Sequence, residues 1–269
     1  MPFLNMDRLK IGVDLASAGL PVRRGLAEAE RMAVAGVQLD AAGDLAPRAL
    51  SQTGRRELLH LLRSHNLRLA ALGCPLRRGL DTAEAQDARI EHVRQVLTLS
   101  FDLGARLVVI QAGRIPAESD TQQTRLMTES LLAVGHHGDR TGTILALETG
   151  LESGQALKDF LDRLDTGGLG VSLDPANFLL NGFDPYENTR ALNSRIAYGQ
   201  AKDARRAAPN RAGQEVPLGH GDIDWMQYVS ILEELNYRGW LTVKRESGHD
   251  RLSDIVSGVQ FLRRFLGRE

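Results

Sequence analysis

The chain alternates short, β-branched apolar runs with longer amphipathic segments from one end to the other. Eight runs have the composition of strands, and they cover residues 9–16, 36–42, 67–74, 105–113, 143–150, 169–176, 195–203 and 240–247. The segments with helical spacing of apolar residues cover 23–36, 54–66, 83–105, 122–137, 154–165, 185–194, 222–236 and 250–267. Because eight strand–helix pairs fit within 269 residues, this alternation predicts an α/β fold of the (β/α)8 TIM-barrel type.

The alternative for such a pattern is an open, doubly wound sheet, which normally contains fewer repeats. No linker-like or low-complexity stretch divides the chain, and its length suits one large domain. We therefore predict a single TIM-barrel domain that spans residues 1–269.

The overall charge is balanced, with 33 Lys and Arg against 34 Asp and Glu and a net charge of -1. Proteins that bind nucleic acid usually carry a basic excess, so we expect no nucleic-acid partner. Cys74 is the only cysteine, which excludes an intrachain disulfide. The N-terminal residues lack the apolar core of a signal peptide, and no apolar run approaches the ~20 residues that span a bilayer. The sequence thus predicts a cytoplasmic protein that does not bind membranes.

Polar residues stand at the ends of the predicted strands, where TIM barrels carry their active sites. The four most conspicuous are Glu148, Asp174, Gln200 and Lys244, at the ends of the last four runs. Asp14, Gln38, Asp40 and Gln111 stand at the ends of three earlier runs, with Gln38 and Asp40 in the same one. Side chains alternate along a strand, so Lys202 shares a face with Gln200, and Glu246 shares one with Lys244. A single acid at a strand end is often only a helix cap, but acids on adjacent strands with a lysine nearby predict a shared pocket.

The second half of the chain resembles the sugar phosphate isomerase/epimerase superfamily, whose members have xylose isomerase-like TIM barrels. The segments that carry this resemblance are LALETG (145–150), LDPANFLLNGFDP (173–185), AKDA (201–204), EVPLGHGDIDW (215–225) and NYRGWLTVKRES (236–247). LDPAN and PLGHGDIDW are the most specific of them. The first half fits only as part of a barrel.

The resemblance implies roles for particular residues. Glu148 matches a glutamate that binds metal and acts as acid or base, and Asp174 matches a metal-binding aspartate. Gln200 stands where the family has a metal-binding histidine, and Lys244 stands where it has the second acid/base glutamate. Lys202 matches a lysine on the substrate side of the site. These matches predict catalytic roles for Glu148, Lys244 and Lys202, and substrate contacts for Gln111, Asp174, Gln200, Asp203 and Glu246.

The substitutions at positions 200 and 244 indicate a degenerate metal site, because a protonated lysine has no lone pair and repels cations. The family's site, with three carboxylates, a neutral histidine and a divalent cation, has a net charge of -1. Glu148, Asp174, Gln200 and a protonated Lys244 have the same net charge. Our hypothesis is that the Lys244 ammonium replaces the metal and pairs with Glu148 and Asp174. We therefore expect either no cofactor or a weakly bound Mn²⁺, Mg²⁺ or Zn²⁺ on those two carboxylates.

An alternative is a shifted metal site that Glu246 would form with His220 or His249.

Two functions follow from the resemblance. One is a sugar or sugar-phosphate isomerase or epimerase that transfers a proton next to a carbonyl, with a metal-independent form possible. The other is a non-catalytic relative that binds a carbohydrate or a protein partner. A nuclease like endonuclease IV is disfavoured, since it needs several zinc ions and more ligands. The expected ligand is a small carbohydrate. Because dimers and tetramers are common in this family, the resemblance also implies a homo-oligomer.

Overall fold

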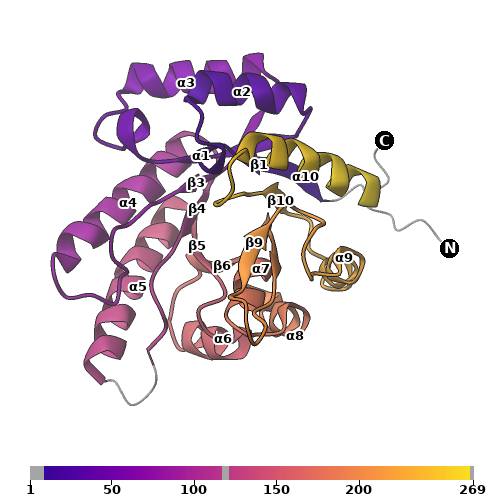
Figure 1. Cartoon of the computed structure of the whole chain (residues 1–269). Coiled ribbons are helices and arrows are strands. Elements are labelled where there is room, and N and C mark those ends of the chain that lie inside the picture. Colours follow the sequence, from indigo (N-terminus) through magenta and orange to yellow (C-terminus); the bar gives the residue numbers. More distant parts are fainter. Residues whose placement is uncertain (1–8, 117–120, 267–269) are drawn as a thin grey trace.

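Eight parallel strands close into a barrel, with helical segments on its outer side (Figure 1). The structure is a computed structural model that describes residues 9–116 and 121–266. The barrel strands are β1 (Lys10–Asp14), β2 (Gly36–Asp40), β3 (Arg68–Gly73), β4 (Leu107–Ile110), β5 (Ile144–Glu148), β6 (Leu169–Leu173), β7 (Ile196–Ala201) and β10 (Trp240–Val243). Their order around the ring is β1-β10-β7-β6-β5-β4-β3-β2. This closure confirms the predicted (β/α)8 barrel and excludes the open sheet.

Helices surround this ring. They are α1 (Leu15–Ala18), α2 (Val22–Arg31), α3 (Gln52–Ser64), α4 (Gln86–Asp102), α5 (Thr121–Thr141), α6 (Gly154–Asp162), α7 (Pro175–Leu180), α8 (Pro185–Ala191), α9 (Trp225–Glu234) and α10 (Arg251–Phe265), with 3₁₀ turns η1 (Gly43–Leu45) and η2 (Asn193–Arg195). All of the α-helices in the described residues except α1 and α7 correspond to predicted helical segments. The predicted end of α5 at residue 137 is wrong. The helix continues for one more turn to Thr141, and the next residue, Gly142, has a positive φ of 65° that suits a left-handed cap.

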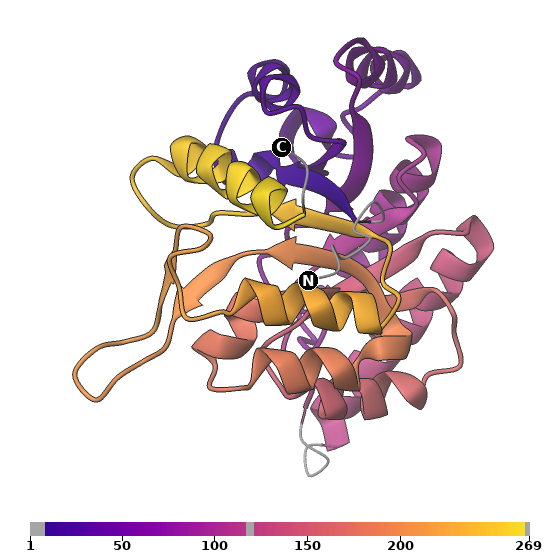
Figure 2. The ribbon, with the colours of Figure 1, turned by 90° about the vertical axis from the view of Figure 1, so that its right-hand side faces the viewer.

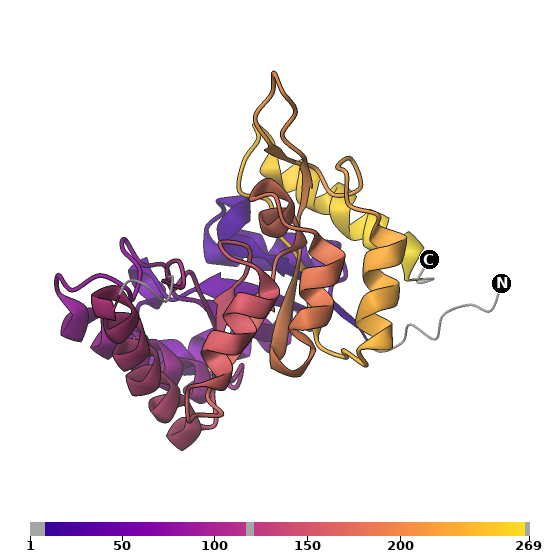
Figure 3. The same ribbon diagram turned by 90° about the horizontal axis from the view of Figure 1, so that it is seen from below.

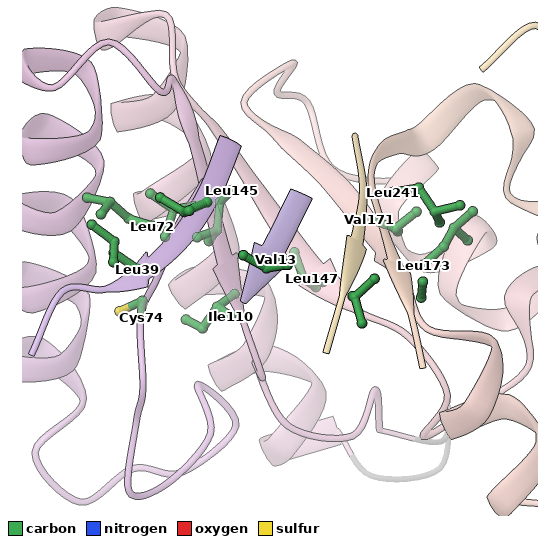
Figure 4. Packing of buried hydrophobic residues seen from close by; sticks show 14 of the residues in the cluster. Val13, Leu39, Leu72, Cys74, Ile110, Leu145, Leu147, Val171, Leu173 and Leu241 are labelled. Atoms are coloured by element: carbon green, nitrogen blue, oxygen red, sulfur yellow. The ribbon is translucent and has the colours of Figure 1, made fainter. Parts of the chain in front are cut away.

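The hydrophobic core has two layers separated by the strands. Outward-facing side chains such as Leu72, Leu145 and Leu241 lie between the barrel and the helices (Figure 4). A smaller cluster fills the barrel interior, and Tyr198 is fully buried in it. Tyr198 Oη and Thr242 Oγ1 lie 2.6 Å apart inside the ring. The lower interior is therefore packed, and the room for a ligand lies at the C-terminal ends of the strands.

One predicted strand is divided in the structure. The run over 195–203 was expected to be continuous, but β7 ends at Ala201 and a separate strand, β8 (Asp203–Arg205), follows it. β8 pairs antiparallel with β9 (Gln214–Val216). The segment between them projects away from the barrel in two perpendicular views (Figure 2, Figure 3). The hairpin thus rises beside the mouth of the barrel at the end of β7.

The described part of the chain contains no helix that combines the length and apolar character needed to cross a bilayer.

Candidate active site at the barrel mouth

Lys244 follows the last residue of β10, and its side chain crosses toward the end of β5. Its Nζ atom lies 3.2 Å and 3.4 Å from the two carboxylate oxygens of Glu148. A second carboxylate, Glu246, lies 3.0 Å from the same nitrogen. The side chains of Lys244 and Glu148 are only 9% and 5% exposed. This pair brings together two strand ends that stand almost a hundred residues apart in the sequence, as the hypothesis on Lys244 required.

The charge on Lys244 is stabilised by its neighbours. Burial alone would lower the pKa of this ammonium, but Glu148, Glu246 and Asp14 outweigh burial and raise the pKa above its ordinary value. Lys244 is therefore a permanent cation at neutral pH. An ammonium in this state can donate hydrogen bonds and stabilise an oxyanion, whereas it cannot act as a nucleophile.

Asp174 pairs with a different lysine from the one that we expected. Its Oδ2 atom lies 2.7 Å from Nζ of Lys202, and the two side chains are 0% and 3% exposed. Its Oδ1 atom accepts a hydrogen bond from the amide of Asn177 and so caps α7. The predicted pairing of Asp174 with Lys244 is thus wrong, because Lys202, at the end of the adjacent strand, occupies the position beside this carboxylate.

Glu246 joins the two lysines into one network. Its oxygens lie 2.7 Å from Nζ of Lys202 and 3.0 Å from Nζ of Lys244. Charges of opposite sign therefore alternate along a chain of five groups: Asp174, Lys202, Glu246, Lys244 and Glu148. Although partial burial opposes ionisation of Glu246, the two lysines lower its pKa to about 2. The network has three carboxylates and two ammonium groups, and every member has an opposite charge beside it.

The β8–β9 hairpin fixes Glu246 over the site. The backbone amides of Glu246 and Ser247 each donate a 2.9 Å hydrogen bond to the carboxylate of Glu215, which lies just before the end of β9. Arg245 lies 3.4 Å from the same carboxylate and pairs with Asp254 of α10. Nothing in the local sequence around Glu215 marked it as a site residue, since its role depends on a contact made 31 residues later.

A cavity of about 390 Å³ opens above this network. Its lining includes Glu148, Lys244 and Glu246, together with Gln111, whose amide lies 3.4 Å from Glu148. Four further polar residues line it from the first two strand ends and the helix that follows the last one: Asp14, Gln38, Asp40 and Arg251. The sequence located Asp14, Gln38 and Asp40 at strand ends but gave them no role, because the resemblance covers the second half of the chain.

Four of the predicted site residues lie outside the lining of this cavity. Lys202 and Asp174 are buried beneath it and support Glu246. Gln200 lies deeper in the barrel, where its amide nitrogen donates to Ser172 Oγ at 3.1 Å. Both carboxylate oxygens of Asp203 accept hydrogen bonds from neighbouring groups, including Trp225 Nε1 and the amides of residues 219 and 221. These contacts make Asp203 a structural residue that holds the loop before α9.

The residues at the mouth do not fit a divalent metal ion. The carboxylates that the resemblance assigns to the metal, Glu148 and Asp174, are each within ion-pair distance of a lysine ammonium. Gln200 offers one amide oxygen, which has no hydrogen-bond partner within the described ranges. His220 and His249 are exposed and do not line the cavity, so the shifted site with Glu246 is not assembled. Across residues 9–116 and 121–266, no three His, Cys, Asp or Glu side chains converge in a way that could hold a metal.

Lys202 is expected to contribute strongly to stability. Replacing it with methionine, Lys202→Met, would leave the fully buried Asp174 without its cation. Breaking such a buried pair should lower the free energy of unfolding by about 3 kcal/mol, measured by urea denaturation. The matched control is Lys158→Met, which removes a surface pair with Asp162 and should cost less than about 1 kcal/mol. Equal losses for the two variants would contradict the importance of the buried pair.

Asp14 should make the stability of the protein depend on pH. Burial raises the pKa of this carboxyl group to about 7, although Lys244 opposes the shift. An unfolded aspartate titrates near pH 3.9, so the native state binds the extra proton between about pH 4 and 7, and stability falls as the pH rises through that range. The free energy of unfolding should fall by on the order of 4 kcal/mol over this pH range.

The measurement is the urea midpoint of the wild type and of Asp14→Asn between pH 4 and 8. Asp14 caps α1 through the amides of Ala16 and Ser17, and asparagine caps helices equally well. The variant should therefore gain stability relative to the wild type as the pH rises. Parallel pH profiles for the two proteins would show that Asp14 does not keep its proton.

The barrel is closed, and acid–lysine pairs lie at the C-terminal ends of its strands. These features place the protein among the (β/α)8 proteins whose ligand site lies at that end of the barrel. A family model described as the xylose isomerase-like TIM barrel matches residues 26–265. The chain therefore belongs to the xylose isomerase-like TIM-barrel family.

Individual relatives are distant in sequence. A xylose isomerase domain protein from Planctomyces limnophilus is 25% identical, with a TM-score of 0.86 over 96% of this chain and 97% of that one. The structure of an L-ribulose 3-epimerase gives a TM-score of 0.78 at 18% identity and covers 96% and 95% of the two chains. An inosose dehydratase of Clostridium tetani is 25% identical over 126 residues, and the match spans 42% of each protein, less than half the length of that curated relative.

Proposed function

We propose that the protein is a sugar isomerase or epimerase that transfers a proton next to a carbonyl without a catalytic metal. The observation that carries the proposal is the Lys244–Glu148 pair, with Nζ 3.2 Å from the carboxylate, at the floor of a cavity of about 390 Å³. A cavity of this size accommodates a monosaccharide or an inositol derivative. Membership in the xylose isomerase-like family supports a small carbohydrate as the ligand.

In this proposal Glu148 is the general base. Its carboxylate removes a proton from the carbon beside the substrate carbonyl. The electron pair of that C–H bond becomes a carbon–carbon double bond, and the π electrons of the carbonyl move to its oxygen. The Lys244 ammonium donates a hydrogen bond to this oxygen and stabilises the charge of the enediolate. The ammonium is held in place by Glu148 and Glu246 before substrate arrives, so little reorganisation is needed during the reaction.

Four of the remaining predicted residues act in two groups. Gln111 and Glu246 line the cavity and are positioned to contact substrate hydroxyl groups. Lys202 and Asp174 act from beneath as positioning residues, since they fix Glu246 and are buried. The catalytic role that the sequence suggested for Lys202 is therefore replaced here by a supporting one. The same contacts support the proposal of a degenerate metal site, because Lys244 and Lys202 pair with the carboxylates that a cation would need.

The test is hydrogen exchange with solvent. The purified protein is incubated in D₂O with L-ribulose and, separately, with an inosose, in the presence and absence of EDTA. Proton NMR should show deuterium at the carbon next to the carbonyl at rates that EDTA does not change. Exchange that requires added Mn²⁺ or Mg²⁺ would overturn the metal-independent mechanism. Saturable binding of a probe with no exchange would instead favour the non-catalytic carbohydrate-binding relative.

A further inference from the structure

Asp40 presents a free carboxylate to the cavity. It is the last residue of β2, it is partly buried, and it lines the cavity that also contains Glu148 and Lys244. Within the described parts of the chain, its side chain has neither a hydrogen bond nor an ion pair, whereas Glu148, Glu246 and Asp174 each have a cationic partner. A carboxylate without a structural partner at the mouth of a barrel is available for a bound ligand.

The backbone around Asp40 is shaped for this carboxylate. Gly73 stands directly opposite Asp40 in the register between β2 and β3. A Cβ atom at position 73 would lie only 2.1 Å from Asp40 Oδ1. The absence of a side chain at Gly73 therefore provides the space that the carboxylate occupies, and the neighbouring strand fixes its direction.

Asp40 and Glu148 approach the cavity from nearly opposite sides. β2 and β5 are separated by β3 and β4, so the two strands are three steps apart in a ring of eight. Their charges also interact: burial raises the pKa of Asp40, Lys244 opposes this, and repulsion from Glu148 adds to the increase. Two carboxyl groups on opposite sides of a ligand, at least one of them inclined to hold a proton, form an arrangement suited to acid–base catalysis on both faces.

We propose that Asp40 is the second acid/base residue of the site and completes the proton transfer that Glu148 begins. The proposal rests on the proposed function. The role that Lys244 no longer fills at the end of β10 has in this chain moved two strands around the ring, to the end of β2 on the other side of β1.

The proton balance is simple. Glu148, as a carboxylate, takes the proton from the substrate carbon, and the enediolate forms. In an epimerisation Asp40, in its protonated form, gives its proton to the opposite face of the same carbon, and the original carbonyl re-forms. In an isomerisation it gives the proton to the neighbouring carbon, the hydroxyl proton of the enediolate moves from one oxygen to the other, and the carbonyl forms on the first carbon. Glu148 then carries a proton and Asp40 a negative charge. Release of one proton from Glu148 to water and uptake of one proton from water by Asp40 restore the starting state. No oxidant, reductant or other reactant is required.

The experiment compares two half-reactions in Asp40→Asn. Deuterium exchange into L-ribulose and the inosose reports the step at Glu148, and formation of the epimeric or isomeric product reports the second step. The variant should keep exchange within the same order of magnitude as the wild type. It should lose product formation by roughly 10²-fold or more, with KM little changed. A second variant, Gly73→Ala, keeps the carboxyl group but displaces it and should impair the same step.

Asp44→Asn is the matched control, because Asp44 is an exposed acid in η1 outside the lining of this cavity. Thermal unfolding of each variant verifies that it folds. Product formation by Asp40→Asn at the rate of the control would overturn the role of Asp40 while leaving the proposed function intact. Absence of both exchange and product in the wild type would overturn the proposed function and the role of Asp40 together.

Discussion

Replacing Glu148 with glutamine should reduce deuterium exchange at the substrate carbon by roughly 10²–10⁴-fold, the range in which a positioned general base contributes to a rate. Glutamine preserves the size of the side chain and its hydrogen bonds with Asn177 and Gln111. It removes only the basic lone pair and the negative charge. Folding should therefore survive, since Lys244 retains Glu246 as an ionic partner. The measurement is the exchange rate by proton NMR at saturating substrate.

Glu152→Gln supplies the comparison for this variant. Glu152 lies four residues further along the chain, outside the cavity lining, and accepts a hydrogen bond from the amide of Ile115. We expect its replacement to leave the exchange rate close to that of the wild type. If Glu148→Gln exchanged as fast as Glu152→Gln, the base would have to be sought among the other carboxylates of the cavity.

The second large expected effect is a gain in bound metal when the lysine-based site is converted into a metal site. In the double variant Gln200→His/Lys244→Glu, the family's four ligand types stand at positions 148, 174, 200 and 244. Loss of one ammonium and gain of one carboxylate make the site more negative by two charges, which a divalent cation would neutralise. After incubation with Mn²⁺ and desalting, elemental analysis should find about one ion per chain in the double variant and far less in the wild type.

The single variant Gln200→His separates the two contributions. It adds an imidazole ligand but leaves Lys244 within 3.2 Å of Glu148, so it should retain as little Mn²⁺ as the wild type. Stoichiometric metal in the wild type would contradict the view that Lys244 occupies the place of the ion. Retention by the single variant would show that the missing histidine, rather than the lysine, weakens the site.

The sequence was sufficient to predict the fold because the patterns that indicate strands and helices are local. Alternation of apolar runs with helical periodicity depends on residues a few positions apart, and all eight barrel strands appear where this alternation predicts them. The errors fall where tertiary contacts decide the outcome. The run after β7 divides into β8 because its second part pairs with β9 as a hairpin, a partner that periodicity within the run does not reveal.

The candidate site divides in the same way. Position at a strand end follows from the local pattern, and four residues that the sequence places at strand ends line the cavity: Gln111, Glu148, Lys244 and Glu246. Which charged side chains form ion pairs depends on the distances between strands that are far apart in the sequence. The positions of the strand ends in the closed barrel decide that Lys202 rather than Lys244 pairs with Asp174, and the sequence contains no measure of those positions.

What the sequence by itself determined is therefore the barrel, the end of it that carries the candidate site, and the presence of a lysine there where the resemblance leads one to expect an acid. Only the tertiary structure decided that Asp174 pairs with Lys202, that Glu246 bridges two lysines, and that Asp40 faces the cavity with a free carboxylate. The physical reason is that strand and helix formation depend on short-range periodicity. The state of a charged group depends instead on burial and on neighbours that only the closed barrel brings together.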